Sequence, residues 1–427
     1  MVRDLVTEAG GDIDLAQYGI IYLDEVDKIA STGRIIGADV SRTGVQRALL
    51  KPMEETEVEL KVPHDPISIM QEIERFRKTG QRDKRTISTK NILFIMSGAF
   101  GGLSEIIDKR ISSQSIGFGA KIKESKSESD LLRQVKSEDL VEFGFETEFV
   151  GRLPVRAVLE PLSEDDLLEI LRNPNNPVIL GKKLDFAAYG ISVRFEDKLL
   201  RSLAKQAFSE NTGARGLVSA VERALLIFEK HLPSTDVEKF PATLPIVESP
   251  EKTLDYYTNP EHRQEVGEIF ESLAVEEKAF IREYITANKK IFSERYGLSL
   301  TPSRIELASD FYSMQITDIG RVMDKIKSYC DDIKKMELDF FKSHHINIVM
   351  EDDATDYMIE QTIRNNIAPE QLYKKLNSDF EFGLKLVREK TGKNRFFLTR
   401  SALMSPENYI GTLIKEALSQ PRQKEEL

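Results

Sequence analysis

Residues 20–25 read Ile20-Ile21-Tyr22-Leu23-Asp24-Glu25, a β-branched apolar run that ends in two acids. Such a run is typical of a strand buried in a parallel sheet. Residues 91–96 form a second apolar run, which ends just before Ser97. The segment 44–51 lies between the two runs and has the apolar spacing of a helix. This alternation predicts an α/β fold with a parallel sheet over residues 1–160.

The composition limits the classes of protein to which the chain can belong. It has 427 residues, with 60 Lys and Arg against 71 Asp and Glu, and the formal net charge of −11 argues against nucleic acid as a partner. No segment approaches the roughly 18 apolar residues of a membrane-spanning helix, so we expect no membrane partner either. The single cysteine, Cys330, excludes an internal disulfide framework and a cysteine-rich zinc site. These features favour a globular protein of a reducing, cytoplasmic compartment.

Two further domains are predicted after residue 160. Ser163 and the acids that follow it are typical of a helix start, and residues 191–195 alternate like a short strand. We therefore expect residues 161–248 to form a small, α-rich domain. Residues 249–427 have long helical patterns and few strand signals, which predict a mostly helical extension.

The extension contains a weak internal echo of the small domain. The strand-like run 191–195 corresponds to residues 346–350, and Asn211 corresponds to Asn366, at a constant offset of 155. A fixed offset of this kind is the mark of a repeat. We expect a degenerate second copy of the small domain at about 338–420. The alternative is that helix–strand–helix units share such a pattern by chance.

Asp24 and Glu25 are candidate functional residues because of their place at the end of a strand. Ligands of open α/β sheets bind at the carboxyl ends of the strands. Two acids there can divide the work, since one can hold Mg²⁺ through its water shell while the other orients or deprotonates an attacking water. The alternative is an acidic strand end that leads into a solvated helix.

Two arginines could serve a phosphate group. Arg152 stands between Gly151 and Pro154, which predicts a short turn from which it could reach a phosphate on a neighbouring subunit. Arg215 lies at a predicted helix start in the small domain, where it could contact a γ-phosphate. The alternative for each is an ordinary surface arginine in an ion pair or in solvent.

These segments together resemble the ClpX-type AAA+ unfoldases, the ATP-dependent partners of the ClpP peptidase. The resemblance covers roughly residues 1–248, including 20–28, 44–51, 98–100, 148–154 and 213–217 in the family's order. It implies ATP and Mg²⁺ as cofactors and a homo-oligomeric, hexameric ring that threads polypeptide substrates. The resemblance also assigns roles to single residues. It implies that Asp24 is the Mg²⁺-associated acid, Glu25 the catalytic base, Ser97 near the sensor-1 position, Arg152 the arginine finger and Arg215 the sensor-2 residue.

An apolar tripeptide, Ile116-Gly117-Phe118, interrupts a stretch rich in Ser, Lys and Gly. It is similar to the tripeptide with which ClpX-type unfoldases dock on a ClpP-like peptidase. Two large apolar side chains on a polar loop can enter an apolar cleft of a partner. The alternative is a loop tucked against its own domain. The related HslU-like unfoldases lack the motif, so they are the less favoured relatives.

The sequence lacks one part of the family pattern, because no G-x-x-x-x-G-K-[ST] phosphate-binding loop occurs in it. Comparison with the family places Met1 after that loop. The chain is therefore expected to be either a truncated gene product, inactive as given, or a degenerate paralogue. Joint retention of Glu25, Arg152 and Arg215 favours truncation. We expect an ATPase subunit that feeds substrates to a ClpP-like peptidase. The alternatives are a non-hydrolysing regulatory or adaptor paralogue and an HslU-like unfoldase.

Overall fold

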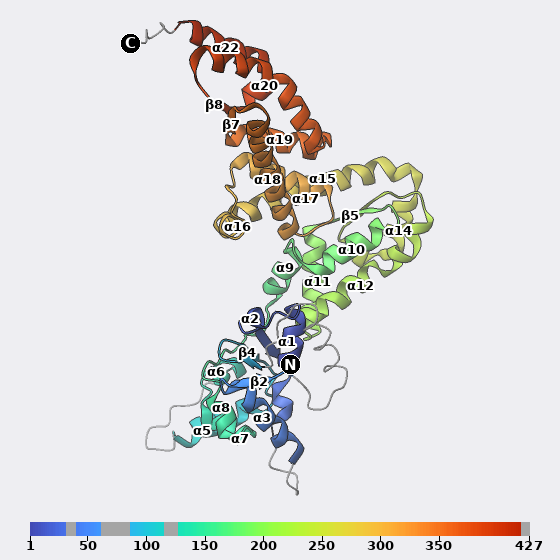
Figure 1. The fold of residues 1–427 in the computed structure, drawn as a ribbon. Coiled ribbons are helices and arrows are strands. Elements are labelled where there is room, and N and C mark those ends of the chain that lie inside the picture. Colours follow the sequence, from blue (N-terminus) through green and yellow to red (C-terminus); the bar gives the residue numbers. More distant parts are fainter. Residues whose placement is uncertain (31–39, 61–85, 115–126, 420–427) are drawn as a thin grey trace, which may run out of the picture. The chain divides into compact units, whose positions relative to one another are not determined.

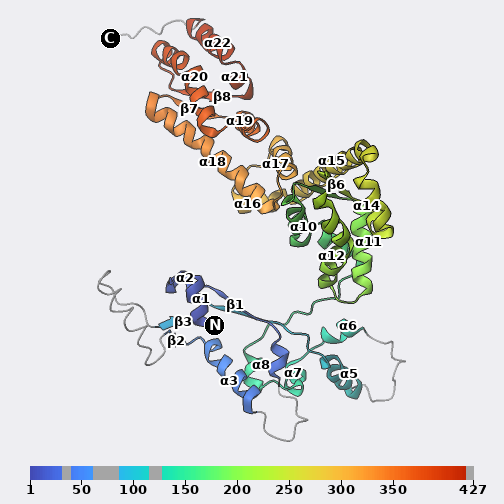
Figure 2. The ribbon, with the colours of Figure 1, turned by 90° about the vertical axis from the view of Figure 1, so that its right-hand side faces the viewer.

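The chain forms two compact units, Met1–Pro161 and Leu162–Leu427, and each is described by itself (Figures 1 and 2). The structure is a computed structural model, and it describes residues 1–30, 40–60, 86–114 and 127–419. Within those residues, none of the helices is long and apolar enough to cross a membrane.

The first unit is built around a two-stranded parallel sheet of β1 and β4. Its elements in chain order are α1 (Val2–Glu8), α2 (Ile13–Ala16), β1 (Ile20–Leu23), the 3₁₀ turn η1 (Val26–Ile29), α3 (Val40–Met53), β2 (Glu57–Glu59), β3 (Thr86–Ser88), β4 (Leu93–Met96), α5 (Leu103–Gln114), α6 (Glu128–Leu132), α7 (Ser137–Phe143) and α8 (Thr147–Gly151). β1 pairs with β4 so that Leu23 lies opposite Met96, and β2 pairs with β3 in an antiparallel hairpin. The predicted parallel sheet is thus confirmed, and its two carboxyl ends lie side by side.

Only one face of the β1–β4 sheet is covered. Ile21 is buried in a cluster with Val2 and Ala16 of the first two helices. The side chains that alternate with it along the strands are exposed: Ile20 by 60%, Tyr22 by 58%, Leu93 by 54% and Ile95 by 42%. The expectation that both strands are buried is therefore wrong for this face. Apolar strands of a parallel sheet are ordinarily covered on both sides, and among the described residues none packs over these four side chains closely enough to bury them.

A second core of the first unit lies under α3 and α8. It contains a row of aromatic rings, in which Phe145 stacks on Phe149 at 5.6 Å and on Phe143 at 6.0 Å between ring centres. Leu49 and Leu50 of α3 complete this cluster. The core fixes α3 and α8 next to the turn that follows β1.

The second unit has two parallel strand pairs, β5–β6 and β7–β8, within a helical frame. Its elements are α9 (Glu164–Arg172), α10 (Pro177–Ala187), β5 (Ser192–Phe195), α11 (Asp197–Ser209), α12 (Ala214–His231), η2 (Leu232–Ser234), β6 (Lys239–Ala242), α13 (Pro245–Glu248), α14 (Pro250–Thr258), η3 (Pro260–His262), α15 (Arg263–Ala287), α16 (Lys289–Tyr296), α17 (Pro302–Met314), α18 (Ile319–His344), β7 (Asn347–Met350), α19 (Asp352–Asn365), α20 (Pro369–Thr391), β8 (Arg395–Leu398), α21 (Arg400–Met404) and α22 (Pro406–Ser419).

The β5–β6 pair has a core of stacked aromatic side chains. Phe240 lies 5.1 Å from Phe228 and 5.3 Å from Phe186, measured between ring centres. Ser163 begins α9 with a capping box, as its sequence predicts. The same apolar cluster extends beyond residue 248 and includes Tyr257 and Val266.

The two strand pairs follow the same chain path at nearly the offset seen in the sequence. Ser192 pairs with Lys239 in the first and Asn347 with Arg395 in the second, both in parallel register. The special backbone positions also correspond. Asn211 and Asn366 both have left-handed φ angles, of 53° and 52°, after the helix that follows the strand. These parallels support the duplication, which stays a prediction.

Candidate functional site

Asp24 and Glu25 follow β1 directly, at the carboxyl end of the sheet. Glu25 has a left-handed φ of 54° and turns the chain into η1. A non-glycine residue in this region carries backbone strain, which is common at functional sites. The Asp24 Oδ1 atom accepts a hydrogen bond of 2.9 Å from the Glu25 backbone N–H. The local fold thus holds the Asp24 carboxylate and the Glu25 backbone at the end of one strand.

Ser97 joins this pair from the neighbouring strand end. Its hydroxyl donates to Asp24 Oδ1 at 2.6 Å, and its backbone bonds to Leu23 and Val26 on either side of the acids. Since the single hydroxyl proton of Ser97 is used on Asp24, the phenol of Tyr22, also 2.6 Å away, is the donor to Ser97 Oγ. The structure therefore brings the predicted Asp24, Glu25 and Ser97 together and adds Tyr22, which the sequence analysis did not identify.

Gly98 is required beside this site for a steric reason. A Cβ atom at Gly98 would lie 2.4 Å from Asp27 Oδ1, closer than any real side chain allows. That oxygen is buried and, among the described residues, has no hydrogen-bond partner. The other carboxylate oxygen of Asp27 lies 3.9 Å from Lys28 Nζ, and a larger residue at position 98 would displace this side chain.

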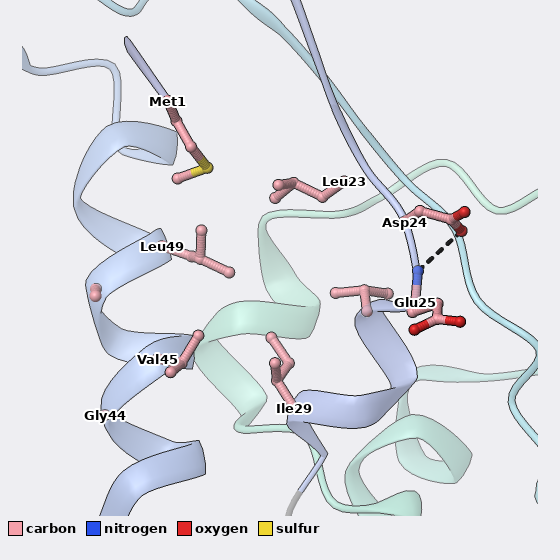
Figure 3. Close-up of a pocket in the computed structure, with 10 residues that line it drawn as sticks. Met1, Leu23, Asp24, Glu25, Ile29, Gly44, Val45 and Leu49 are labelled. Atoms are coloured by element: carbon pink, nitrogen blue, oxygen red, sulfur yellow. Dashed lines mark hydrogen bonds between the residues drawn. The ribbon is translucent and has the colours of Figure 1, made fainter. Parts of the chain in front are cut away.

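A cavity of 520 Å³ adjoins the acid pair. Its walls are mostly apolar, and Figure 3 shows Leu23, Ile29, Val45 and Leu49 facing one another across it, while the Asp24 carboxylate points away towards β4. Its polar groups are thus confined to one end, where Asp24 and Glu25 stand. The cavity leaves room next to the acids, and a group placed there would meet mostly apolar side chains.

Gln46 holds the helix α3 against the site and was also missed by the sequence analysis. It is fully buried, and its amide donates to Ile29 O at 2.8 Å while its oxygen accepts from Glu146 N, also at 2.8 Å. It therefore links η1 to α8. The sequence signal was a polar residue one turn before the apolar Leu49 and Leu50 on the same face of a helix.

Each remaining predicted residue has its own location. Arg152 ends α8, is half exposed, and pairs with Glu54 at 3.8 Å. Arg215 lies in the second unit, exposed in the first turn of α12, so its place relative to Asp24 is not described. Ile116, Gly117 and Phe118 lie outside the described residues.

The donor set at the strand ends fits Mg²⁺. Carboxylate and hydroxyl oxygens from Asp24, Glu25 and Ser97 are the hard ligands that this ion prefers, and it needs only one or two carboxylates when water and phosphate supply the rest. No group of three or more His, Cys, Asp or Glu side chains that could hold a metal ion is found in the part of the chain that the structure describes.

Comparison with known proteins adds a family to this geometry. Residues 2–156 match the model of the AAA domain (Cdc48 subfamily), and residues 162–227 match the C-terminal, D2-small domain of ClpB protein. An ATP-dependent Clp protease ATP-binding subunit ClpX from Treponema denticola is 41% identical over 226 residues, which are 52% of each chain. These matches support a ClpX-type AAA+ protein over about the first half of the chain.

Two other ClpX relatives agree with this assignment of the ClpX-type region. The protein from Azotobacter vinelandii is 37% identical over 243 residues, or 55% of this chain, and that from Borrelia duttonii is 38% identical over 233 residues, or 54%. Each match covers 52% of the relative. The chain thus spans about half the length of the curated relatives it matches, and its fold is a partial AAA+ α/β domain followed by a helical lid and extension.

Proposed function

We propose that the chain supplies the catalytic acids and the lid of a ClpX-type ATPase, which hydrolyses ATP in a hexameric ring and feeds unfolded polypeptides to a ClpP-like peptidase. The observation that carries this proposal is the group of Asp24, Glu25 and Ser97 at adjacent parallel strand ends, joined by hydrogen bonds of 2.6 and 2.9 Å. The three relatives support it, since each is named as an ATP-binding subunit of a Clp protease.

In this proposal, Asp24 holds Mg²⁺ through water, and Glu25 accepts the proton of the water that attacks the γ-phosphate. The bound ion would supply neutralising charge for the phosphates. Ser97, itself held by Tyr22, keeps the Asp24 carboxylate in one orientation through its hydroxyl. Glu25 is free of that hydrogen-bonded chain of side chains, so its carboxylate can turn towards water.

In the same proposal, two arginines reach the γ-phosphate from other parts of the assembly. We assign Arg152 to the γ-phosphate bound by a neighbouring subunit. An arginine finger in that place is worth about 10³–10⁵ in the rate of hydrolysis. It would exchange its 3.8 Å contact with Glu54 for that phosphate. Arg215 would contact the γ-phosphate from the lid, where its place in the first turn of α12 leaves its side chain exposed.

The absence of a phosphate-binding loop limits what residues 1–427 can do with ATP on their own. A triphosphate is held mainly by backbone N–H groups and the lysine of the G-x-x-x-x-G-K-[ST] loop. Since the sequence contains no such loop, we expect residues 1–427 alone to hydrolyse no ATP. The same observation favours the second candidate function, a non-hydrolysing regulatory or adaptor protein.

The test joins the phosphate-binding half of a ClpX-type relative ahead of Met1 and measures phosphate release by the assembled rings. We expect hydrolysis that is lost in Glu25→Gln and, separately, in Arg152→Ala. Rings mixed from these two variants should recover part of it, because some sites then have both groups. Hydrolysis that persists in Glu25→Gln, or verified mixed rings that stay inactive, would contradict the assignment. A chimera that forms rings and binds nucleotide but never hydrolyses it would favour the adaptor.

A further inference from the structure

The two strand pairs of the second unit each have a core face and an opposite face. In β5–β6 the opposite face is formed by Ser192, Arg194, Lys239 and Pro241, and the helix α15 lies across it. In β7–β8 the residues at the same register positions are Asn347, Val349, Arg395 and Phe397. The first pair therefore shows how a face of this construction is occupied.

The helix α15 binds the first pair through apolar and charged contacts together. Its residues Val266, Phe270 and Leu273 are buried and follow the spacing of one helical face. The centre of the Phe270 ring lies close to two cations, 5.8 Å from the Arg194 guanidinium carbon and 5.7 Å from Lys239 Nζ. Lys239 also pairs with Glu271, at 2.5 Å. This face thus binds an acidic helix that inserts an aromatic ring beside its cations.

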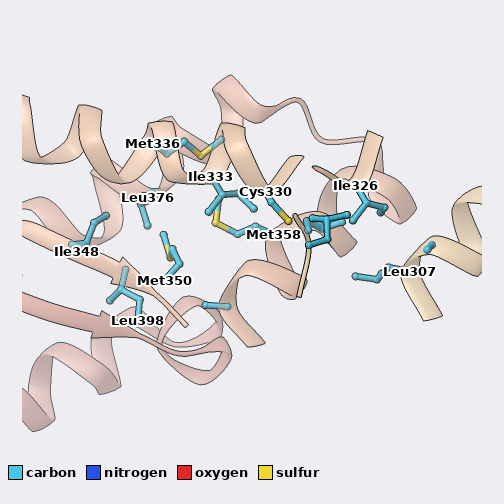
Figure 4. Packing of buried hydrophobic residues seen from close by; sticks show 14 of the residues in the cluster. Leu307, Ile326, Cys330, Ile333, Met336, Ile348, Met350, Met358, Leu376 and Leu398 are labelled. Atoms are coloured by element: carbon cyan, nitrogen blue, oxygen red, sulfur yellow. The ribbon is translucent and has the colours of Figure 1, made fainter. Parts of the chain in front are cut away.

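The second pair presents a similar face without a cover. Figure 4 shows Ile348, Met350 and Leu398 directed to the core on one side of the strands. On the other side Arg395 is exposed, in the position of Lys239, and its guanidinium carbon lies 5.1 Å from the centre of the Phe397 ring. Phe397 is 46% exposed, whereas Pro241 in the matching position is buried under α15. Among the described residues 162–419, none packs over this face closely enough to bury Asn347, Arg395 or Phe397, and Val349 is half-buried.

The positive charge of the uncovered face favours a negatively charged partner. Arg395 is exposed at the start of β8 and gives this face its positive charge, since Asn347, Val349 and Phe397 beside it are uncharged. The helix that covers the matching face of β5–β6 has five glutamates between residues 265 and 277, at 265, 268, 271, 276 and 277. We propose that the open face of β7–β8 binds an acidic amphipathic helix of a partner protein, which places an aromatic ring beside Arg395 and Phe397. This inference is independent of the nucleotide site.

The probe for this site is a synthetic peptide of residues 263–280 of the chain itself, labelled with fluorescein. A hydrocarbon link between positions 264 and 268, both exposed on α15, keeps it helical, because isolated helices of this length are marginal in water. Its binding to the full chain is followed by fluorescence anisotropy. We expect saturable binding, and an Arg395→Glu chain should bind about three- to tenfold more weakly, since an ion pair and a cation–π contact are both lost.

Two controls separate this site from general charge attraction. Lys374→Glu, at an exposed position of α20, makes the same change of charge elsewhere and should leave the affinity unchanged. A peptide with Glu271→Lys should bind the Arg395→Glu chain better than the unaltered peptide does, because the pair is restored with its signs exchanged. Circular dichroism of each variant verifies that it is folded.

The proposal is overturned by any of three results with folded proteins: no saturable binding of the unaltered peptide, equal weakening by Arg395→Glu and Lys374→Glu, or no recovery with the Glu271→Lys peptide. The first result would show that the face accepts no such helix. The second would show attraction by net charge alone. The third would show that the peptide binds in another register or at another site.

Discussion

Replacing Glu277 by Gln should cost the second unit about 3–5 kcal/mol of unfolding free energy, because it breaks a buried ion pair from one side. Glu277 of α15 accepts hydrogen bonds from Lys183 of α10 and, at 2.6 Å, from Arg194 of β5. The Lys183 side chain is only 5% exposed and that of Arg194 16%. Arg194 also donates to the Ser313 carbonyl of α17, so Glu277 and Arg194 together link four elements.

The matched control lies on the same helix. Glu271→Gln removes the partner of Lys239, but those two side chains are 62% and 50% exposed. Water screens such a pair, so its loss should cost only about 0–1 kcal/mol. The difference between the two variants isolates the effect of burial, since both changes convert one glutamate of α15 into glutamine.

Urea titrations of the full chain can assign the loss to the second unit. Cys330, the single cysteine, is 8% exposed in the second unit's core, so its reactivity with a thiol reagent reports on that unit alone. Circular dichroism follows both units. We expect Glu277→Gln to lower the urea concentration at which Cys330 reacts, and Glu271→Gln to leave it nearly unchanged. Equal midpoints for the two variants would refute the reasoning.

The pH dependence of the unfolding free energy tests whether the buried Lys183 causes the deficit of Glu277→Gln. Burial holds the pKa of Lys183 below its ordinary value, and the negative charge of Glu277 raises it part of the way back. Without that charge, the pKa of Lys183 falls further. Between that lowered pKa and about 10.4, the unfolded chain binds more protons at Lys183 than the folded chain does, so stability rises with pH. Because the pKa of Lys183 is lowered further in Glu277→Gln, the deficit of this variant should shrink as the pH rises through the interval between the two folded-state pKa values. A deficit that grows over this range would contradict a buried lysine as its cause.

Three other predictions concern the first unit. Gln46→Leu should destabilise it by about 1–3 kcal/mol in urea titrations, because the Glu146 N–H loses its acceptor. Burial would raise the pKa of Asp139, but hydrogen bonds from Arg110 and from the Lys136 backbone hold it below its ordinary value. Asp139→Asn should therefore be less stable at pH 7, with a deficit that begins to shrink near pH 4 and is lost as the pH falls through the lowered pKa of Asp139; a deficit that is independent of pH would argue against the pair. In completed rings, Phe118→Ala should weaken binding to a ClpP-like peptidase in a pull-down and leave phosphate release unchanged.

The candidate site shows what a sequence pattern can predict and where it stops. The β-branched runs before Asp24 and Ser97 predict two parallel strands, and parallel pairing alone places their carboxyl ends together. The hydrogen bonds from Tyr22 through Ser97 to Asp24 join positions 73 to 75 residues apart. They depend on the register of the two strands, which periodicity does not specify. Gln46 was missed for the same reason, since its partner Glu146 is 100 residues away.

The sequence indicates where the small domain begins more clearly than where it ends, because buried residues of one helix, α15, pack into two different cores. Ser163 begins α9 with its own capping signal, so the first boundary can be read locally. No such signal separates the small domain from the extension within α15. Val266 belongs to the core of β5–β6, whereas Ile281 and Ile285 belong to the core of the extension. The apolar spacing runs through both stretches of one helix, so the sequence alone does not show where its packing partner changes.

Glu277, which lies between these stretches, accepts hydrogen bonds from Lys183 and Arg194 of the small domain, and Arg194 in turn donates to Ser313 of the extension. The buried carboxylate is therefore where the small domain and the extension become one folded unit.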